Sequence, residues 1–114
     1  MPNQTHHLDK IFYALADPTR RSVMERLCRG PASVSELAQP FDMALPSFLQ
    51  HLKVLEQSGL LRSRKVGRVR TCQIEPHALE MTEHWLAEQR TLWERRLDQL
   101  DDYLINLTNK EKEQ

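Results

Sequence analysis

Residues 46–74 read PSFLQHLKVLEQSGLLRSRKVGRVRTCQI, and their pattern is the most informative about the fold. Apolar residues recur at helical spacing in its first half, which predicts a helix over about 46–58 with one buried side. These residues are Phe48, Leu52 and Leu55. The second half predicts a two-stranded hairpin, 60–66 and 69–74, with its turn at Gly67-Arg68. The stretch therefore predicts an amphipathic helix followed directly by a β-hairpin.

Further helices are expected before this stretch. The first covers about residues 8–16, and the second runs from Asp17-Pro18, a favourable helix start, to about Arg29. Ser33-Val34-Ser35-Glu36 matches a capping box and opens a third helix, which Pro40 ends. We expect the apolar side chains of the second and third helices to point into the core. They are Val23, Met24, Leu27, Val34, Leu37 and Ala38.

A long helix is predicted after the hairpin, over about residues 77–107, and a break near Met81-Thr82 is left open. From Trp93 onward its leucines are spaced 4, 3, 4 and 3 residues apart, the seam pattern by which two helices pack side by side. The full stripe is Leu86, Trp93, Leu97, Leu100, Leu104 and Leu107. Because the helix is long and the rest of the chain small, this stripe favours a homodimer.

These elements predict a mostly α fold with a small β-hairpin: a winged helix-turn-helix with a long C-terminal dimerisation helix. We expect one domain over 1–114, in which 8–75 form the DNA-binding core and wing and 76–108 form the helical dimerisation segment. Residues 1–7 and 109–114 are expected to be flexible.

The charge is distributed unevenly. The net charge is zero, but residues 1–75 hold 11 Lys and Arg against 7 Asp and Glu, whereas the rest holds 5 against 9. Within 62–70 there are five cations, and no acid occurs between Glu56 and Glu75. A basic surface of this kind can bind a polyanion although the whole chain is neutral.

Double-stranded DNA is the polyanion that fits this pattern. In a helix-turn-helix, the polar face of the second helix enters the major groove, where Ser, Gln and His can hydrogen-bond to base edges. Lys and the wing cations suit phosphates. The DNA-binding set is therefore Ser47, Gln50, His51, Lys53, Arg64, Lys65, Arg68 and Arg70. For His51 a contact with a neighbouring side chain remains an alternative.

Other functions lack support in the sequence. We find no nucleophile–base arrangement and no Gly-rich phosphate loop, so we expect no enzyme and no cofactor. No apolar run approaches the ~18 residues that cross a bilayer, and the polar N-terminus lacks a signal-peptide core, so a cytoplasmic protein without membrane partners is expected. Cys28 and Cys72 are interpreted as mostly buried thiols, since a switch between them would need proximity.

Three quoted segments resemble the ArsR/SmtB family of bacterial repressors: LADPTRR (15–21), SELA (35–38) and HLKVLEQSGLL (51–61). The resemblance covers about 8–75, and it implies a homodimeric winged helix-turn-helix repressor that binds an imperfect inverted repeat. It also implies that the first and last helices form the dimer interface. The dimerisation residues would be Leu8, Ile11, Phe12, Leu86, Trp93, Leu97, Leu100 and Leu104.

The sequence departs from that family at three places. Ala44 stands where many members have a Ser that caps the second helix of the motif, so Asp42 caps it instead or the helix starts uncapped. Leu49 also replaces a Ser; it either meets a thymine methyl or packs inward. The third helix has no cysteine pair for metal. The remaining metal candidates are His77, Glu80, His84 and Glu88, with His6-His7 at the N-terminus, and we expect no metal site among them.

Two alternatives remain open. A winged helix can serve as a protein-interaction module without specific DNA binding, although the uninterrupted cationic wing argues against this. An unknown effector, bound at the dimer interface, could shift the equilibrium between DNA-competent and incompetent dimers.

Overall fold

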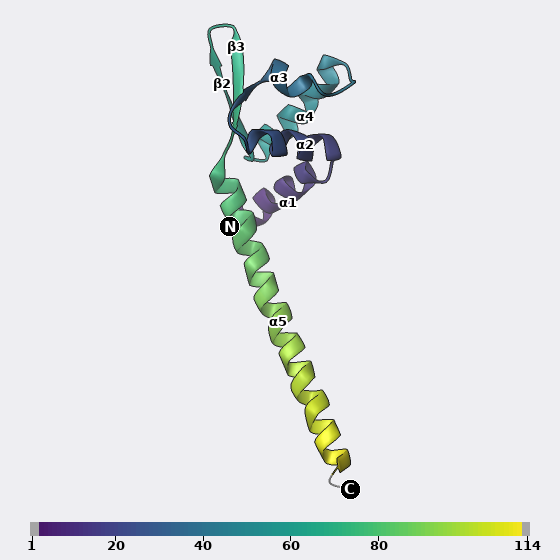
Figure 1. Cartoon of the computed structure of the whole chain (residues 1–114). Coiled ribbons are helices and arrows are strands. Elements are labelled where there is room, and N and C mark those ends of the chain that lie inside the picture. Colours follow the sequence, from purple (N-terminus) through teal and green to yellow (C-terminus); the bar gives the residue numbers. More distant parts are fainter. Residues whose placement is uncertain (1–2, 113–114) are drawn as a thin grey trace. The chain divides into compact units, whose positions relative to one another are not determined.

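The computed structural model of the chain describes residues 3–112. Residues up to Thr82 form one compact unit, and residues from Glu83 onward form a second. The first unit contains α1 (Asn3–Leu15), α2 (Pro18–Leu27), β1 (Ala32–Ser33), α3 (Val34–Ala38), α4 (Leu45–Gln57), β2 (Leu61–Val66) and β3 (Val69–Ile74). The last helix, α5 (Pro76–Lys112), starts in the first unit and supplies the second (Figure 1). The predicted class, mostly α with a small β-hairpin, is confirmed.

The core of the first unit lies between the helices and the sheet. It draws on α1, α2, α3, α4, the strands and the first turn of α5, and the largest fully buried side chain is Phe48. The predicted inward residues of α2 and α4 are confirmed: Val23, Met24, Leu27, Phe48, Leu52 and Leu55 are all buried. Helical periodicity located this core because each helix has only one apolar stripe to bury.

The sheet has three antiparallel strands in the order β1-β3-β2. The predicted hairpin is confirmed, with Leu61 paired to Ile74 at its base and Val66 to Val69 beside the turn. Gly67 has a φ of 64°, a left-handed conformation that glycine adopts without a steric penalty. The sequence analysis missed β1, because two residues, Ala32 and Ser33, are too few to show an alternating pattern.

The helix starts agree with the capping signals. The Asp17 side chain accepts from the backbone N–H of Arg20 at 3.2 Å, and Ser33 and Glu36 form both bonds of the predicted capping box. For α4, the N-cap residue is Ala44 and makes no side-chain bond, so the uncapped start holds and Asp42 does not cap the helix.

Two helix boundaries differ from the expectations. α5 is continuous through Met81-Thr82, so the break left open there does not exist; the Thr82 hydroxyl donates to the carbonyl of Ala78 at 2.9 Å within the helix. α1 begins at Asn3 and α5 runs to Lys112, so residues 3–7 and 109–112, which were expected to be flexible, are helical. Residues 1–2 and 113–114 lie outside the described residues.

Candidate nucleic-acid interface

Helix α4 presents one buried and one exposed side. Phe48 is buried, and the ring of Phe41, from the connection that leads into α4, lies 5.5 Å from its ring. This aromatic pair fixes the start of α4 against the core. The opposite side is exposed at Ser47, Leu49, Gln50 and Lys53. Hydrogen-bonding and cationic side chains therefore project from the second helix of the helix-turn-helix.

The β2–β3 hairpin forms the wing, and every residue from Arg64 to Arg70 is exposed. Lys65 lies directly opposite Arg70 in the register. Two like charges in a cross-strand pair destabilise a hairpin unless an anion lies nearby. Arg62, at the base of the wing, instead forms an ion pair with Glu75 at 3.6 Å. The wing therefore carries uncompensated positive charge at its tip and neutralised charge at its base.

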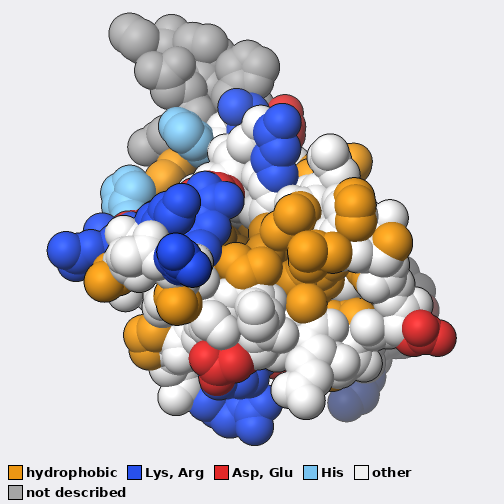
Figure 2. All heavy atoms as spheres, turned by 90° about the horizontal axis from the view of Figure 1, so that it is seen from above, with side chains coloured by type: hydrophobic (Ala, Val, Ile, Leu, Met, Phe, Trp, Pro, Cys, Tyr) orange, Lys and Arg blue, Asp and Glu red, His pale blue; other side chains and the backbone are white. Residues whose placement is uncertain are grey.

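A hollow of about 370 Å³ lies between α4 and the wing. It brings together three predicted DNA-binding residues, Gln50, Lys53 and Arg70. Its lining consists of Val34, Leu49, Gln50, Leu52, Lys53, Glu56, Leu61, Ser63, Arg70 and Cys72. Figure 2 looks onto this end of the molecule and shows Lys and Arg side chains gathered beside an apolar patch. Leu49 is 40% exposed here, so the structure fits a contact with a thymine methyl better than inward packing.

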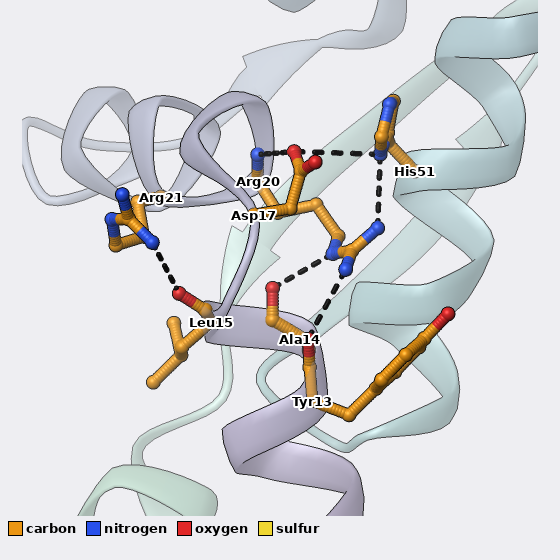
Figure 3. Close-up of polar contacts among 7 residues, drawn as sticks. All are labelled: Tyr13, Ala14, Leu15, Asp17, Arg20, Arg21 and His51. Atoms are coloured by element: carbon orange, nitrogen blue, oxygen red, sulfur yellow. Dashed lines mark hydrogen bonds and ion pairs between the residues drawn. The ribbon is translucent and has the colours of Figure 1, made fainter.

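His51 lies apart from the other predicted DNA-binding residues. It is half-buried, and its Nδ1 lies 3.1 Å from Nη1 of Arg20 and 3.7 Å from Oδ2 of Asp17 (Figure 3). Residues that follow each other in a helix are turned by ~100° from one another, so Gln50 faces the hollow while His51 faces α2. The structure thus shows His51 in contact with a neighbouring side chain, that of Arg20.

Arg20 is a site residue that the sequence analysis missed. Its side chain is only 8% exposed. Nε donates to the carbonyl of Ala14 at 2.7 Å and Nη2 donates to that of Tyr13 at 3.1 Å, while the guanidinium lies 5.1 Å from the centre of the Tyr13 ring. The neighbouring Arg21 donates to the carbonyl of Leu15 at 2.8 Å. The two arginines thus satisfy three carbonyls at the C-terminus of α1, where cations are favourable.

A sequence signal for this role existed in the segment LADPTRR. A helix that ends just before Asp-Pro leaves carbonyls without partners, and arginines in the first turn of the next helix can reach back to them. Asp17-Pro18 of this segment predicted the start of α2, but no role was predicted for Arg20 or Arg21.

Asp17 stands at the same corner between α1 and α2. Burial is the largest influence and raises the pKa of Asp17, but the backbone N–H groups of Arg20 and Thr19 and the charges of His51 and Arg20 outweigh it. The net effect lowers the pKa below its ordinary value of 3.8. A carboxylate is therefore held beside Arg20 and His51 under all ordinary conditions.

The predicted dimerisation residues differ in exposure. Ile11 is 0% exposed and belongs to the core of the chain itself, so it has no surface for a partner; this is a correction. Phe12 is exposed and Leu8 half-buried. In the second unit, the α5 stripe is 46–69% exposed at Leu86, Trp93, Leu97, Leu100 and Leu104. A run of apolar side chains with that exposure is typical of an interface.

The cysteines and the metal candidates also have defined positions. Cys28 is exposed, so its expected burial was wrong. Cys72 is buried, and this burial, reinforced by the charge of Glu56, raises the pKa of its thiol although Arg70 opposes the shift. Nε2 of His84 lies 2.9 Å from Oε1 of Glu88 on the surface of α5. Among the described side chains, those of residues 7–112, no three His, Cys, Asp or Glu converge in a way that would hold a metal ion; the side chain of His6 lies outside this range.

None of the helices in the described part of the chain combines the length and apolar character needed to cross a membrane.

An exposed polar face on the second helix of a helix-turn-helix, beside a cationic hairpin, defines a winged helix-turn-helix DNA-binding protein. A family model described as a helix-turn-helix domain matches residues 15–64. The chain is 34% identical over 86 residues to the arsenical resistance operon repressor of Escherichia coli, across 70% of this chain and 74% of that protein. The chain belongs to the ArsR family of transcriptional regulators, and the resemblance seen in the sequence is confirmed.

Two further similarities agree with this assignment. The HTH-type transcriptional regulator Rv2034 of Mycobacterium tuberculosis is 44% identical over 71 residues, which are 62% of this chain and 66% of that one. A crystal structure of an ArsR family transcriptional regulator matches with a TM-score of 0.76 and 62% identity, across 79% of this chain and 93% of that one. Because these relatives are transcriptional regulators, the alternative of a protein-interaction module is not favoured.

Proposed function

We propose that the chain is a homodimeric repressor that binds an inverted-repeat operator in double-stranded DNA. Ser47 and Gln50 on α4 read base edges in the major groove, and the exposed Leu49 beside them contacts a thymine methyl. Phosphates are bound by Lys53, Arg64, Lys65, Arg68 and Arg70. His51 takes no part in direct DNA contact, because its side chain faces Arg20.

The observation that carries this proposal is the cross-strand pair of Lys65 and Arg70 in an exposed wing. The pair destabilises the free hairpin, whereas a phosphate placed between the two cations turns the same arrangement into a favourable one. The hollow that Arg70 lines also contains Gln50 and Lys53, so one DNA duplex can meet the wing and α4 together.

The stripe on α5 supports a dimer. A single chain leaves these apolar side chains about half exposed, and burying them against a second copy is favourable by roughly 25 cal/mol per Å² of apolar surface. Leu8 and Phe12 of α1 are proposed to meet the partner as well. A two-fold dimer presents its recognition helices with the symmetry of an inverted repeat. Among the relatives, the Bacillus subtilis protein SdpR is a transcriptional repressor, 25% identical over 79 residues.

A mobility-shift experiment tests this function. The duplex is the region upstream of the gene for this chain, compared with a scrambled duplex of the same length and base composition. We expect a discrete complex with the upstream duplex that weakens steeply as salt increases, since bound phosphates release their counterions. Equal binding to both duplexes, or an affinity that does not change with salt, would contradict the proposal.

A further inference from the structure

The guanidinium of Arg20 connects the end of α1 to helix α4. Its Nε and Nη2 are fixed by the carbonyls of Ala14 and Tyr13, and its Nη1 points to Nδ1 of His51 at 3.1 Å (Figure 3). With a side chain only 8% exposed, Arg20 has little freedom to move. The position of its third nitrogen is therefore set by α1 and α2, before His51 is considered.

This hydrogen bond requires a particular protonation state of His51. A guanidinium only donates hydrogen bonds, so Nδ1 of His51 must accept, and an imidazole that accepts at Nδ1 is neutral and carries its proton on Nε2. Asp17 Oδ2 lies 3.7 Å from the same nitrogen, which is too far for a hydrogen bond. A neutral imidazole with its proton on Nε2 can therefore accept this bond at Nδ1, and a protonated imidazole cannot.

The N-terminus of helix α4 lacks a capping hydrogen bond. The N-cap residue Ala44 makes no side-chain bond, so the contact of His51 adds a directional bond to the apolar packing of Phe48. His51 follows Gln50 directly and stands two residues before Lys53, so its contact with Arg20 lies within one helical turn of two predicted DNA-binding side chains. The contact lies on the inner side of α4, away from the hollow that faces DNA.

We propose that Arg20 and His51 are positioning residues, which orient α4 for DNA and do not touch the duplex. This inference rests on the proposed function. It assigns to His51 a role that differs from base reading, and it gives Arg20 a role in addition to closing the end of α1.

The proposal implies a dependence on pH. The titratable and charged groups that face His51 are Asp17 and Arg20 at the start of α2, with Tyr13 of α1 on the far side of Arg20. A protonated imidazole cannot accept at Nδ1 and places a positive charge beside Arg20. The orienting bond is therefore available to a neutral His51 and is lost when the imidazole is protonated.

Two variants at the same position separate the bond from the charge. His51→Ala removes the acceptor. His51→Gln retains an acceptor oxygen that does not titrate. The matched control is His84→Gln, which removes an exposed histidine on α5. The probe is a labelled duplex selected from a randomised library by the wild-type chain, and its affinity is measured from about pH 8 to about pH 5.5, the range in which histidines titrate. Thermal unfolding of each variant is recorded in parallel.

Loss of one hydrogen bond to a charged group predicts that His51→Ala binds the selected duplex about tenfold more weakly at the upper pH. We expect His51→Gln to restore most of this affinity and to keep it on acidification, whereas the wild type and His84→Gln weaken together. Binding to an unselected duplex should change less, because phosphate contacts depend little on the rotation of α4.

The failures are distinguishable. If the wild type selects no duplex, the proposed function is wrong. If the wild type selects one and His51→Ala binds it equally well, or His51→Gln binds as weakly as His51→Ala, the positioning role is wrong. An equal pH dependence in the wild type and His51→Gln would also overturn it.

Discussion

Ser63 on β2 donates its hydroxyl hydrogen to the carboxylate of Glu56 on α4, with 2.7 Å between the two oxygens. Glu56 lies in the last turn of the recognition helix and Ser63 near the base of the wing, so this bond connects the two elements that are proposed to meet DNA. Both residues line the hollow between these elements. The direction of the wing is thus coupled to α4 by a directional contact as well as by the core.

The first prediction concerns this bond. Ser63→Ala should weaken DNA binding about two- to fivefold for every sequence, because an exposed hydrogen bond to a charged group contributes about 1 kcal/mol and orients the wing as a whole. Hydrogen exchange should become faster in the amides of β2 and β3. Ser22→Ala, at an exposed position of α2, is the control. Unchanged affinity and exchange would show that the core fixes the wing unaided.

The second prediction concerns the wing cations. Arg68→Ala should weaken binding to all sequences alike, and it should reduce the slope of log affinity against log salt by about 1, as the loss of one phosphate contact does. Arg95→Ala removes the same charge from an exposed position of α5 and should leave that slope unchanged. Salt titrations by fluorescence anisotropy measure both slopes, and equal changes in the two variants would argue against a wing contact.

The third prediction concerns base reading. Gln50→Ala should change the preference between sequences, at a cost of roughly 1–3 kcal/mol for the preferred base pair and little for others. Gln57→Ala changes the same residue type at the other end of α4 and is the comparison. Selection of duplexes from a randomised library reports the preference. A uniform loss across all sequences would assign Gln50 to a phosphate.

The fourth prediction concerns the dimer. Leu104 and Ile105 are adjacent in α5 and 50% and 57% exposed, but only Leu104 belongs to the seam. Leu104→Glu should shift the chain to monomers, because it places a charge in an apolar interface. Ile105→Glu should leave the dimer intact. Sedimentation across a range of concentrations distinguishes them, and two variants with the same mass would disprove the seam.

The fifth prediction concerns Asp17. Its folded-state pKa is lower than the ordinary 3.8, so its charge stabilises the fold above that pH and the stabilisation disappears as the pH falls through the folded-state value. Asp17→Asn keeps a capping oxygen but has no charge. Urea unfolding should show the wild type more stable at pH 7, by less than about 1 kcal/mol for a partly exposed carboxylate, and equal to the variant in strong acid. A constant difference at all pH values would show that the charge is not involved.

The sequence predicted those parts of the fold that depend on local patterns. Helical periodicity located α2 and α4 with their buried faces, the capping box located the start of α3, and Gly67 between two β-rich runs located the hairpin. Such signals are local because each helix or hairpin buries one periodic face. The strand β1 was missed because it depends on pairing with β3, and the sequence left open whether the last helix breaks near Met81-Thr82, where α5 is continuous.

For the candidate site, the residue types and their order in the chain were determined by the sequence: a cationic wing, polar residues on α4 and an apolar seam on α5. Only the tertiary structure determined which of these side chains lie close together. It brings Gln50, Lys53 and Arg70 around one hollow and turns His51 away to Arg20, 31 residues distant in the chain. Periodicity determines the face of a helix, but the partner that meets a face depends on how distant helices pack, and that packing is a property of the whole fold.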